Sequence, residues 1–246
     1  MKKNKNTKII PALILTIIGV LFGIDNLQDF DKNYKNKNFI NIAEEILGIF
    51  QNEYEVKGKS IYYEIDKNPP QFSNEDLQMA PDYQEFSELD NLNRVGPANA
   101  LIGPESLPKK ARGDISKVYP SGWNQKFYKF VDGGAVYNRC HLIAYQLTGE
   151  NDNWKNLMTG TRSFNTKGML PFENVVAEYI KNTGKKVRYR VTPIFVGDEL
   201  VARGVIIEAY SIEDNGKKIK FRVFAKNIEE GVDIDYKTGR TKRAKN

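Results

Sequence analysis

The chain has 246 residues, of which 40% are hydrophobic and 28% are charged, and these values are typical of an ordinary globular protein with one large or two small domains. Its single cysteine excludes an internal disulfide, so stability has to come from a packed core. The formal net charge is +6, but four lysines and no acidic residue occupy the first eight positions. The net charge of the whole chain is therefore weak support for a polyanionic partner.

The amino-terminal 24 residues read as a signal peptide or an N-terminal membrane anchor. The four lysines are followed by an almost unbroken apolar run, 9–24. The run is shorter than the roughly 20 residues that a spanning helix needs, which favours a signal peptide, whereas the lack of a clear A-x-A cleavage site keeps an uncleaved anchor open. A buried core helix is the alternative. Because the positive charge precedes the run, we expect the rest of the chain to be secreted or held on the extracellular face of the membrane.

Residues 25–59 are expected to form a polar spacer with one short amphipathic helix. The segment 25–38 is rich in lysine and aspartate, and apolar residues recur at helical spacing over 39–50. The partner of this helix would be either the following domain or a membrane surface.

From residue 60 the pattern predicts one α+β domain, with a mixed or antiparallel sheet and helices, extending to residue 239. A strand is predicted at 61–65 and a loop-rich stretch at 96–117. Two further strands, 126–131 and 135–139, surround Asp132-Gly-Gly134 and predict a hairpin that delivers His141 at or just beyond a strand end.

The second half of the domain contains the clearest helix, 170–184. Pro171 suits its first turn, and Gly184 suits its carboxyl-terminal cap. Three strands are predicted after it, at 187–195, 200–210 and 219–225.

Two clusters of cations are candidates for nucleic-acid contact, because binding of a polyanion depends on where cations gather. One is 181–190, with five cations and no acid, and the other is 237–246, with five more, which includes the predicted tail 240–246. The alternative reading is a solvated strand edge for the first and a frayed terminus for the second.

A handful of residues suit metal-assisted attack of water on a phosphodiester. The reaction needs a base, and His141 is the only histidine in the chain. It also needs a hard cation, and Mg²⁺ often takes only one or two protein oxygen ligands. Asn156, Asn165 and Glu173 offer such oxygens, and Arg139, which should point to the same side of its strand as His141, can offer a paired donor to phosphate.

Each of these residues also has a purely structural explanation. A lone histidine is more often a core residue with satisfied hydrogen bonds, asparagine is abundant in this chain, and a glutamate in a first helical turn suits the helix dipole. Spacing alone therefore leaves the catalytic reading and the structural reading both open.

Four stretches closely resemble the DNA/RNA non-specific endonuclease family and, within it, the streptococcal type of secreted DNase. They are YNRCHLIAYQL (137–147), KNLMTGT (155–161), FNTKGMLPFE (164–173) and VRYRVTP (187–193), and the resemblance runs from about residue 61 to residue 239. The family signature is Asp-Arg-Gly-His, so Asn138 and Cys140 depart from it, whereas Arg139 and His141 keep it. The departure at Cys140 raises the question of altered packing or redox sensitivity.

The resemblance implies a ββα-metal, or His-Me finger, nuclease core in a larger α+β domain. By matching position, His141 is implied as general base, Asn165 as the ligand of Mg²⁺ or alternatively Mn²⁺, and Glu173 as support for the hydration shell of the metal. Asn156 is implied to help hold the site, and Arg139 to contact phosphate or support the structure. The implied substrate is DNA, with RNA as an alternative, bound through its phosphates, and no inhibitor or immunity protein is marked. A catalytically silent, surface-tethered DNA-binding protein remains the alternative function.

Overall fold

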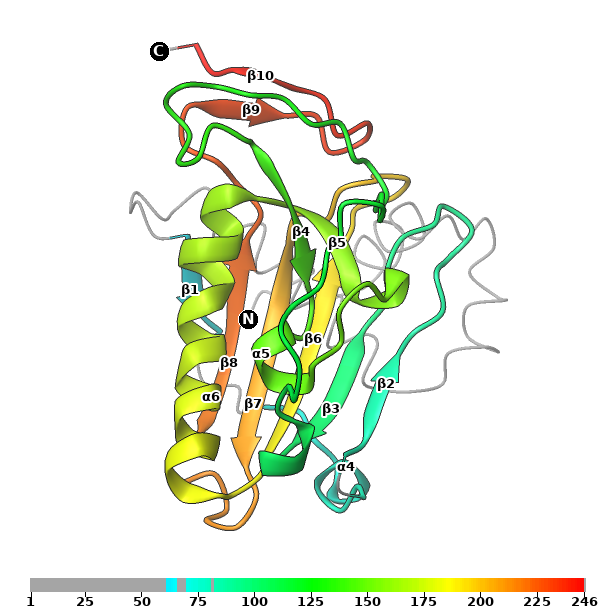
Figure 1. Ribbon diagram of the computed structural model, residues 1–246. Helices are drawn as coiled ribbons and strands as arrows, with labels where there is room; N and C mark the ends of the chain where they lie inside the picture. The colour runs from blue at the N-terminus through cyan, green and yellow to red at the C-terminus, as the bar shows by residue number, and fades with distance from the viewer. Residues whose placement is uncertain (1–60, 66–69, 81, 246) are drawn as a thin grey trace, which may run out of the picture. The chain divides into compact units, whose positions relative to one another are not determined.

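The computed structural model describes residues 61–65, 70–80 and 82–245, and these belong to one unit of contacts, Ser60–Asn246 (Figure 1). The predicted signal segment or anchor and the predicted spacer with its amphipathic helix lie outside the described residues. Within the described ranges, no helix has the length and apolar character needed to cross a membrane.

A six-stranded antiparallel sheet is the centre of this unit (Figure 1). Its strands, in their order across the sheet, are β1 (Tyr62–Glu64), β8 (Lys220–Lys226), β7 (Gly204–Ser211), β6 (Val187–Ile194), β3 (Ala98–Ile102) and β2 (Gln84–Phe86). The predicted strands at 61–65, 187–195, 200–210 and 219–225 correspond to β1, β6, β7 and β8. The predicted α+β class with an antiparallel sheet is confirmed.

One face of the sheet carries the core. Side chains alternate between faces along a strand, so Val187, Tyr189 and Val191 of β6 point into the hydrophobic core. Helix α6 (Leu170–Thr183) covers this face, and Val176 and Ile180 belong to the same core cluster. The helix begins with Pro171 and ends at Gly184, whose φ of 67° is favoured by glycine, as the sequence predicted.

The strand that precedes α6 and the strand that carries His141 form a separate antiparallel pair. They are β5 (Leu157–Thr161) and β4 (Tyr137–His141), and His141 pairs with Leu157. Between β5 and α6 the chain forms the π-helical segment η3 (Phe164–Met169), which runs directly into α6. Glu173 in the first turn of α6 lies within electrostatic range of Cys140 in β4, so the start of α6 comes near β4.

The predicted hairpin from 126 to 139 is wrong in its first strand. The turn exists, since Gly134 donates its backbone N–H to the Val131 carbonyl, but only one bridge, Phe127–Ala135, forms there. Phe127 is 70% exposed, so no neighbouring layer covers a strand at that position. The true partner of β4 is β5, whose five residues are all buried and therefore lack the alternating pattern that predicts a half-buried strand.

The predicted loop-rich stretch at 96–117 conceals β3, which lies between β2 and β6 in the sheet. Ala98 and Ala100 are fully buried, so small side chains fill this part of the core. The remaining short helices are α4 (Asn74–Leu77), η1 (Pro104–Ser106), α5 (Tyr145–Thr148) and η2 (Trp154–Asn156).

The end of the chain forms a small antiparallel pair, β9 (Val232–Ile234) and β10 (Thr241–Arg243), so the predicted basic tail is partly a strand. This segment is tied to the chain that leads into β4. The Tyr137 hydroxyl donates to the Gly239 carbonyl at 2.9 Å, and Lys126 Nζ donates to the Thr241 carbonyl at 3.2 Å.

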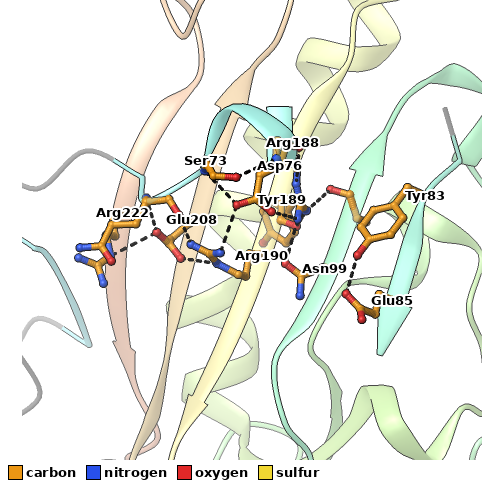
Figure 2. A network of polar contacts seen from close by, with 12 residues as sticks. Ser73, Asp76, Tyr83, Glu85, Asn99, Arg188, Tyr189, Arg190, Glu208 and Arg222 are labelled. Atoms are coloured by element: carbon orange, nitrogen blue, oxygen red, sulfur yellow. Dashed lines mark hydrogen bonds and ion pairs between the residues drawn. The ribbon is translucent and has the colours of Figure 1, made fainter. Parts of the chain in front are cut away.

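The sheet face opposite α6 carries a network of charged side chains (Figure 2). Arg188, only 1% exposed, donates to Asp76, to Asn99 and to the Ala100 carbonyl. Glu208 lies between two arginines, Arg190 at 2.8 Å and Arg222 at 3.4 Å, and these three occupy neighbouring positions on β6, β7 and β8.

This network changes the reading of the cationic cluster 181–190. Arg188 and Arg190 are neither a nucleic-acid surface nor a solvated strand edge, because they are bound to carboxylates and carbonyls on the back of the sheet. In the stretch 181–190, only the lysines remain available as cations that could contact nucleic acid.

Candidate active site

His141 lies at the end of β4 and is buried, with 7% of its surface exposed. Its Nε2 atom is 2.7 Å from the backbone carbonyl oxygen of Asn151. A carbonyl can only accept, so Nε2 carries the proton and Nδ1 keeps a free lone pair in the neutral ring. Burial lowers the pKa of His141 to about 4, with Arg112 acting in the same direction, so the ring is neutral near pH 7.

Asn156 holds the chain just beyond His141. It is fully buried, its side-chain Oδ1 accepts from the backbone N–H of Ile143 at 2.9 Å, and its Nδ2 donates to the Ile143 carbonyl at 3.0 Å. Its own carbonyl accepts from the Leu142 N–H at 2.8 Å. Three bonds therefore fix the two residues that follow the histidine, and Asn156 acts on the position of His141 rather than on a substrate.

Glu173 lies in the first turn of α6 and is also buried, with 7% of its surface exposed. Burial raises the pKa of its carboxyl to about 8. Its carboxyl makes no hydrogen bond or ion pair with another residue of the described ranges. A helix dipole alone does not account for a carboxyl buried this deeply without a partner, because such a group is normally paired.

Asn165 lies in η3, is half-buried, and precedes Glu173 by eight residues along a continuous helical path. Its backbone carbonyl accepts from Leu170, and its side-chain amide makes no hydrogen bond elsewhere in the part of the chain that the structure describes. The π-helical turn sets where this amide points, and π-turns inserted ahead of α-helices are frequent at functional sites.

Arg112, a residue that the sequence analysis did not single out, links the two buried titratable groups. Its positive charge lowers the pKa of both His141 and Glu173, so it lies within electrostatic range of each. Arg112 itself is exposed, so its guanidinium is accessible. The signal in the sequence was the short run Lys109-Lys110-Ala111-Arg112, three cations in four residues.

Arg139 is held within the protein. It donates from Nε to the Val118 carbonyl and from Nη2 to the Ser116 carbonyl, and its guanidinium lies 4.2 Å from the centre of the Trp123 ring. These contacts attach the loop around residue 118 to β4. Of the two roles that the sequence left open for Arg139, this geometry favours structural support over a phosphate contact.

The departure at Cys140 is accommodated by a glycine on the neighbouring strand. Cys140 is fully buried, and a side-chain carbon added to Gly160 would lie 2.5 Å from its sulfur. Burial raises the pKa of the Cys140 thiol far above its ordinary value, which keeps it protonated and unreactive. The substitution therefore changes local packing and does not introduce a redox-sensitive group.

The oxygens offered by the site fit a hard divalent cation. Among the described residues no group of three or more His, Cys, Asp or Glu side chains could hold a metal, so a closed structural site of the zinc type is absent there. The unpartnered amide of Asn165 and the buried carboxyl of Glu173 instead offer oxygen donors to a divalent cation that takes few ligands from the protein.

A family model described as DNA/RNA non-specific endonuclease matches residues 73–213, more than half of the chain. The chain belongs to the DNA/RNA non-specific endonuclease family. This confirms the family predicted from the sequence and, with it, the class of enzyme.

Relatives of this endonuclease agree with that assignment. A curated protein named deoxyribonuclease from Streptococcus dysgalactiae subsp. equisimilis is 33% identical over 109 residues, which are 42% of this chain and only 32% of that protein, so the match spans about a third of the relative. The structure of NucA from Streptococcus agalactiae with magnesium bound matches with a TM-score of 0.67 and 26% identity, over 79% of this chain and 95% of that one. The Sda1 nuclease with bound zinc shares the fold, with a TM-score of 0.63 and 24% identity over 75% and 97% of the two chains.

Proposed function

We propose that this endonuclease is exported and hydrolyses phosphodiester bonds of DNA, and of RNA as a further substrate, with little sequence preference and with Mg²⁺ as cofactor. The observation that carries the proposal is His141. It is the only imidazole of the chain, and it is neutral near pH 7 and oriented by the Asn151 carbonyl so that Nδ1 is the basic atom. Glu173, a second buried titratable group, lies like His141 within electrostatic range of Arg112.

In this mechanism Nδ1 of His141 removes a proton from the water that attacks phosphorus. Asn156 keeps the imidazole in place through its bonds to Ile143. Arg112 brings an accessible guanidinium to the same site and pairs with a phosphate oxygen, which offsets the negative charge that grows on the phosphate.

Asn165 and Glu173 are the residues that would hold the metal, Asn165 as a direct ligand and Glu173 as an orienting carboxylate. Mg²⁺ fits better than zinc, because both donors are oxygens and zinc prefers nitrogen and sulfur ligands. Mn²⁺ takes the same ligands and is the expected substitute. When bound, the cation supplies Lewis-acid stabilisation of the phosphate and the leaving oxygen. Its positive charge also shifts Glu173 toward the ionised form, opposing the effect of burial.

The apolar run 9–24 supports export, either as a signal peptide or as an anchor on the extracellular face of the membrane. The domain boundaries at 24, 59 and 239 remain part of this proposal.

The test is plasmid cleavage by the full chain with Mg²⁺, with EDTA, and after substitution of the site residues. We expect His141→Ala to abolish nicking, and Asn165→Ala to abolish it while Asn165→Asp, which keeps an oxygen donor, retains a measurable rate. Glu178→Gln, an exposed carboxylate on α6, is the matched control and should cut as the wild type does. A folded wild type that binds plasmid but never cuts it with Mg²⁺ or Mn²⁺ would establish the silent DNA-binding alternative instead.

A further inference from the structure

The segment that leads into β4, residues 116–131, combines aromatic rings with positive charge. It holds five aromatic residues, three lysines and no acidic residue. Asp132, which follows the segment, is paired with Arg162 at 2.9 Å. All three lysines are exposed, and so are Tyr119, at 60%, and Phe130, at 47%. Rings that stay exposed in so short a segment, with cations between them, indicate a surface that binds a partner.

One end of this surface lies on the same face of β4 as His141. Side chains alternate along a strand, so Arg139 and His141 point to one face of β4, whereas Cys140 points to the other face and joins the main core. The central guanidinium carbon of Arg139 lies 5.2 Å from the centre of the Tyr119 ring and 4.2 Å from that of the Trp123 ring. Arg139 and His141 are about 7 Å apart along the strand. The exposed ring of Tyr119 therefore lies near the strand face that carries the proposed general base.

The other end lies where residues 126–131 meet the end of the chain (Figure 1). The rings of Tyr128 and Phe130 stack, with centres 5.1 Å apart and planes 20° from parallel. The guanidinium carbon of Arg243 lies 5.5 Å from the centre of the Phe130 ring, and Lys126 Nζ lies 5.4 Å from that of Tyr128. Two nearly parallel rings with a cation beside each one suit a base and its phosphate.

Trp123 and Tyr128 connect the two ends, because both pack against one small core, formed by Val131, Val136, Tyr137 and Val232. The Trp123 ring centre lies 6.4 Å from that of Tyr137, the first residue of β4, and β4 extends about 14 Å from there to His141. At a rise of about 3.4 Å per nucleotide, the surface spans roughly four nucleotides or more. We call it the aromatic track and define it by Tyr119, Trp123, Tyr128, Phe130, Lys126 and Arg243.

The aromatic track fits an unpaired strand of nucleic acid better than other partners. Its cations complement phosphates, and its rings offer faces on which bases stack once they are free of a pairing strand. A membrane rich in anionic lipid attracts the same residue types. The track, however, continues to the His141 face of β4, and the chain belongs to an endonuclease family, so the polyanion expected at this face is a nucleic acid.

We propose that the aromatic track binds an unpaired strand of nucleic acid on one side of the bond that is cut, so that this endonuclease binds single strands more tightly than duplexes. The inference rests on the proposed function, because it puts the cut bond at His141, and it deepens that function by naming the form of the substrate. It also gives a role to the basic end of the chain, since Arg243 belongs to that cluster.

The test measures binding of the full chain to oligo(dT), and to the duplex of oligo(dT) with oligo(dA), by fluorescence anisotropy in EDTA, so that no cleavage is required. We expect the wild type to bind the single strand about tenfold more tightly than the duplex, which is the effect of stacking one base. Phe130→Leu keeps an apolar side chain but loses the ring, so it should weaken single-strand binding about tenfold, and Phe130→Trp should restore it. Tyr119→Leu and Tyr119→Phe should behave in the same way.

Charge is tested separately from the rings. Arg243→Ala should lower the slope of log Kd against log salt concentration for the single strand by about one. Lys220→Ala removes the same charge from an exposed position at the start of β8, outside the track, and should leave the slope as in the wild type.

Equal binding of single strand and duplex by the wild type overturns the inference, and so does a Phe130→Leu variant that binds the single strand like the wild type. Wild-type binding to vesicles of anionic lipid that Phe130→Leu abolishes, with single-strand binding kept, assigns the surface to a membrane and also overturns it. Loss of single-strand binding in Phe130→Leu, when the wild type cuts no DNA, keeps the track and refutes the proposed function.

Discussion

Replacing Glu173 by glutamine should make the metal-free protein more stable at slightly alkaline pH while removing its nuclease activity. Burial raises the pKa of this carboxyl from 4.5 to about 8. Above pH 4.5 an unfolded chain releases the proton and the folded protein retains it, so stability that is fully present below pH 4.5 is lost as the pH rises towards 8. Glutamine keeps the shape and has no proton to lose.

The size of the effect follows from the two pKa values. One unit corresponds to 1.36 kcal/mol, so the penalty reaches about 4 kcal/mol at pH 7.5 and about 1 kcal/mol at pH 5. The side chain is 7% exposed, so solvent screening reduces these values little. The gain from Glu173→Gln should therefore be small in acid and severalfold larger at pH 7.5.

Urea unfolding of the full chain in EDTA, at pH 5 and pH 7.5, measures this gain. Glu178→Gln, on the exposed side of the same helix, is the control and should leave stability unchanged at both pH values. Saturating Mg²⁺ should stabilise the wild type more than Glu173→Gln, because the cation favours the ionised carboxylate. The reasoning is refuted if Glu173→Gln gives the same change at both pH values or destabilises the protein at pH 7.5.

Three further outcomes follow from the same site. The pKa of His141 is lowered from 6.5 to about 4, so the free energy of unfolding should fall by about 3 kcal/mol as the pH drops from above 6.5 to 4. His141→Gln has no imidazole to protonate, so its free energy of unfolding, measured in urea, should not show this loss. Arg112→Ala should lower plasmid cleavage about 100-fold and raise the pKa values of His141 and Glu173. Because the chain has one histidine, an NMR titration of its imidazole measures the pKa of His141 directly. Asn156→Ala should destabilise the protein by about 2–4 kcal/mol and abolish cleavage, because two buried hydrogen bonds are lost. The control Asn153→Ala removes one partly exposed hydrogen bond and should destabilise the protein by less than about 1 kcal/mol. Urea unfolding measures both changes.

Where local rules decide the structure, the sequence was sufficient. The helix at 170–184 was predicted from its proline, its glycine and its apolar face, all of which depend on neighbours along the chain. The strands of the central sheet with alternating or strongly β-branched sequence were predicted for the same reason. By contrast, β5 is buried on both faces and β3 is built partly from alanine, so neither shows a pattern that a single segment can reveal.

The candidate site divides in a similar way. His141 was proposed because it is unique, and Asn165 and Glu173 were proposed by matching the family, since spacing alone left them open; all three roles stay predictions. Arg112 was missed because its effect on His141 and Glu173 depends on where the loop 107–113 lies in the folded protein, which no local pattern shows. Arg188 was misread for the converse reason, since its burial depends on Asp76, more than one hundred residues earlier in the chain.

The bond between Tyr137 and Gly239 ties the strand that ends in His141 to a distant part of the chain. Tyr137 begins that strand, and its hydroxyl is fixed by a carbonyl that lies 102 positions later. Gly239 has a φ of 75° and packs so closely on Gly122 that no other residue fits there. The strand that carries His141 lacks this anchor in any chain that stops short of Gly239, so the position of the histidine depends on a segment to which none of the proposed active-site residues belongs.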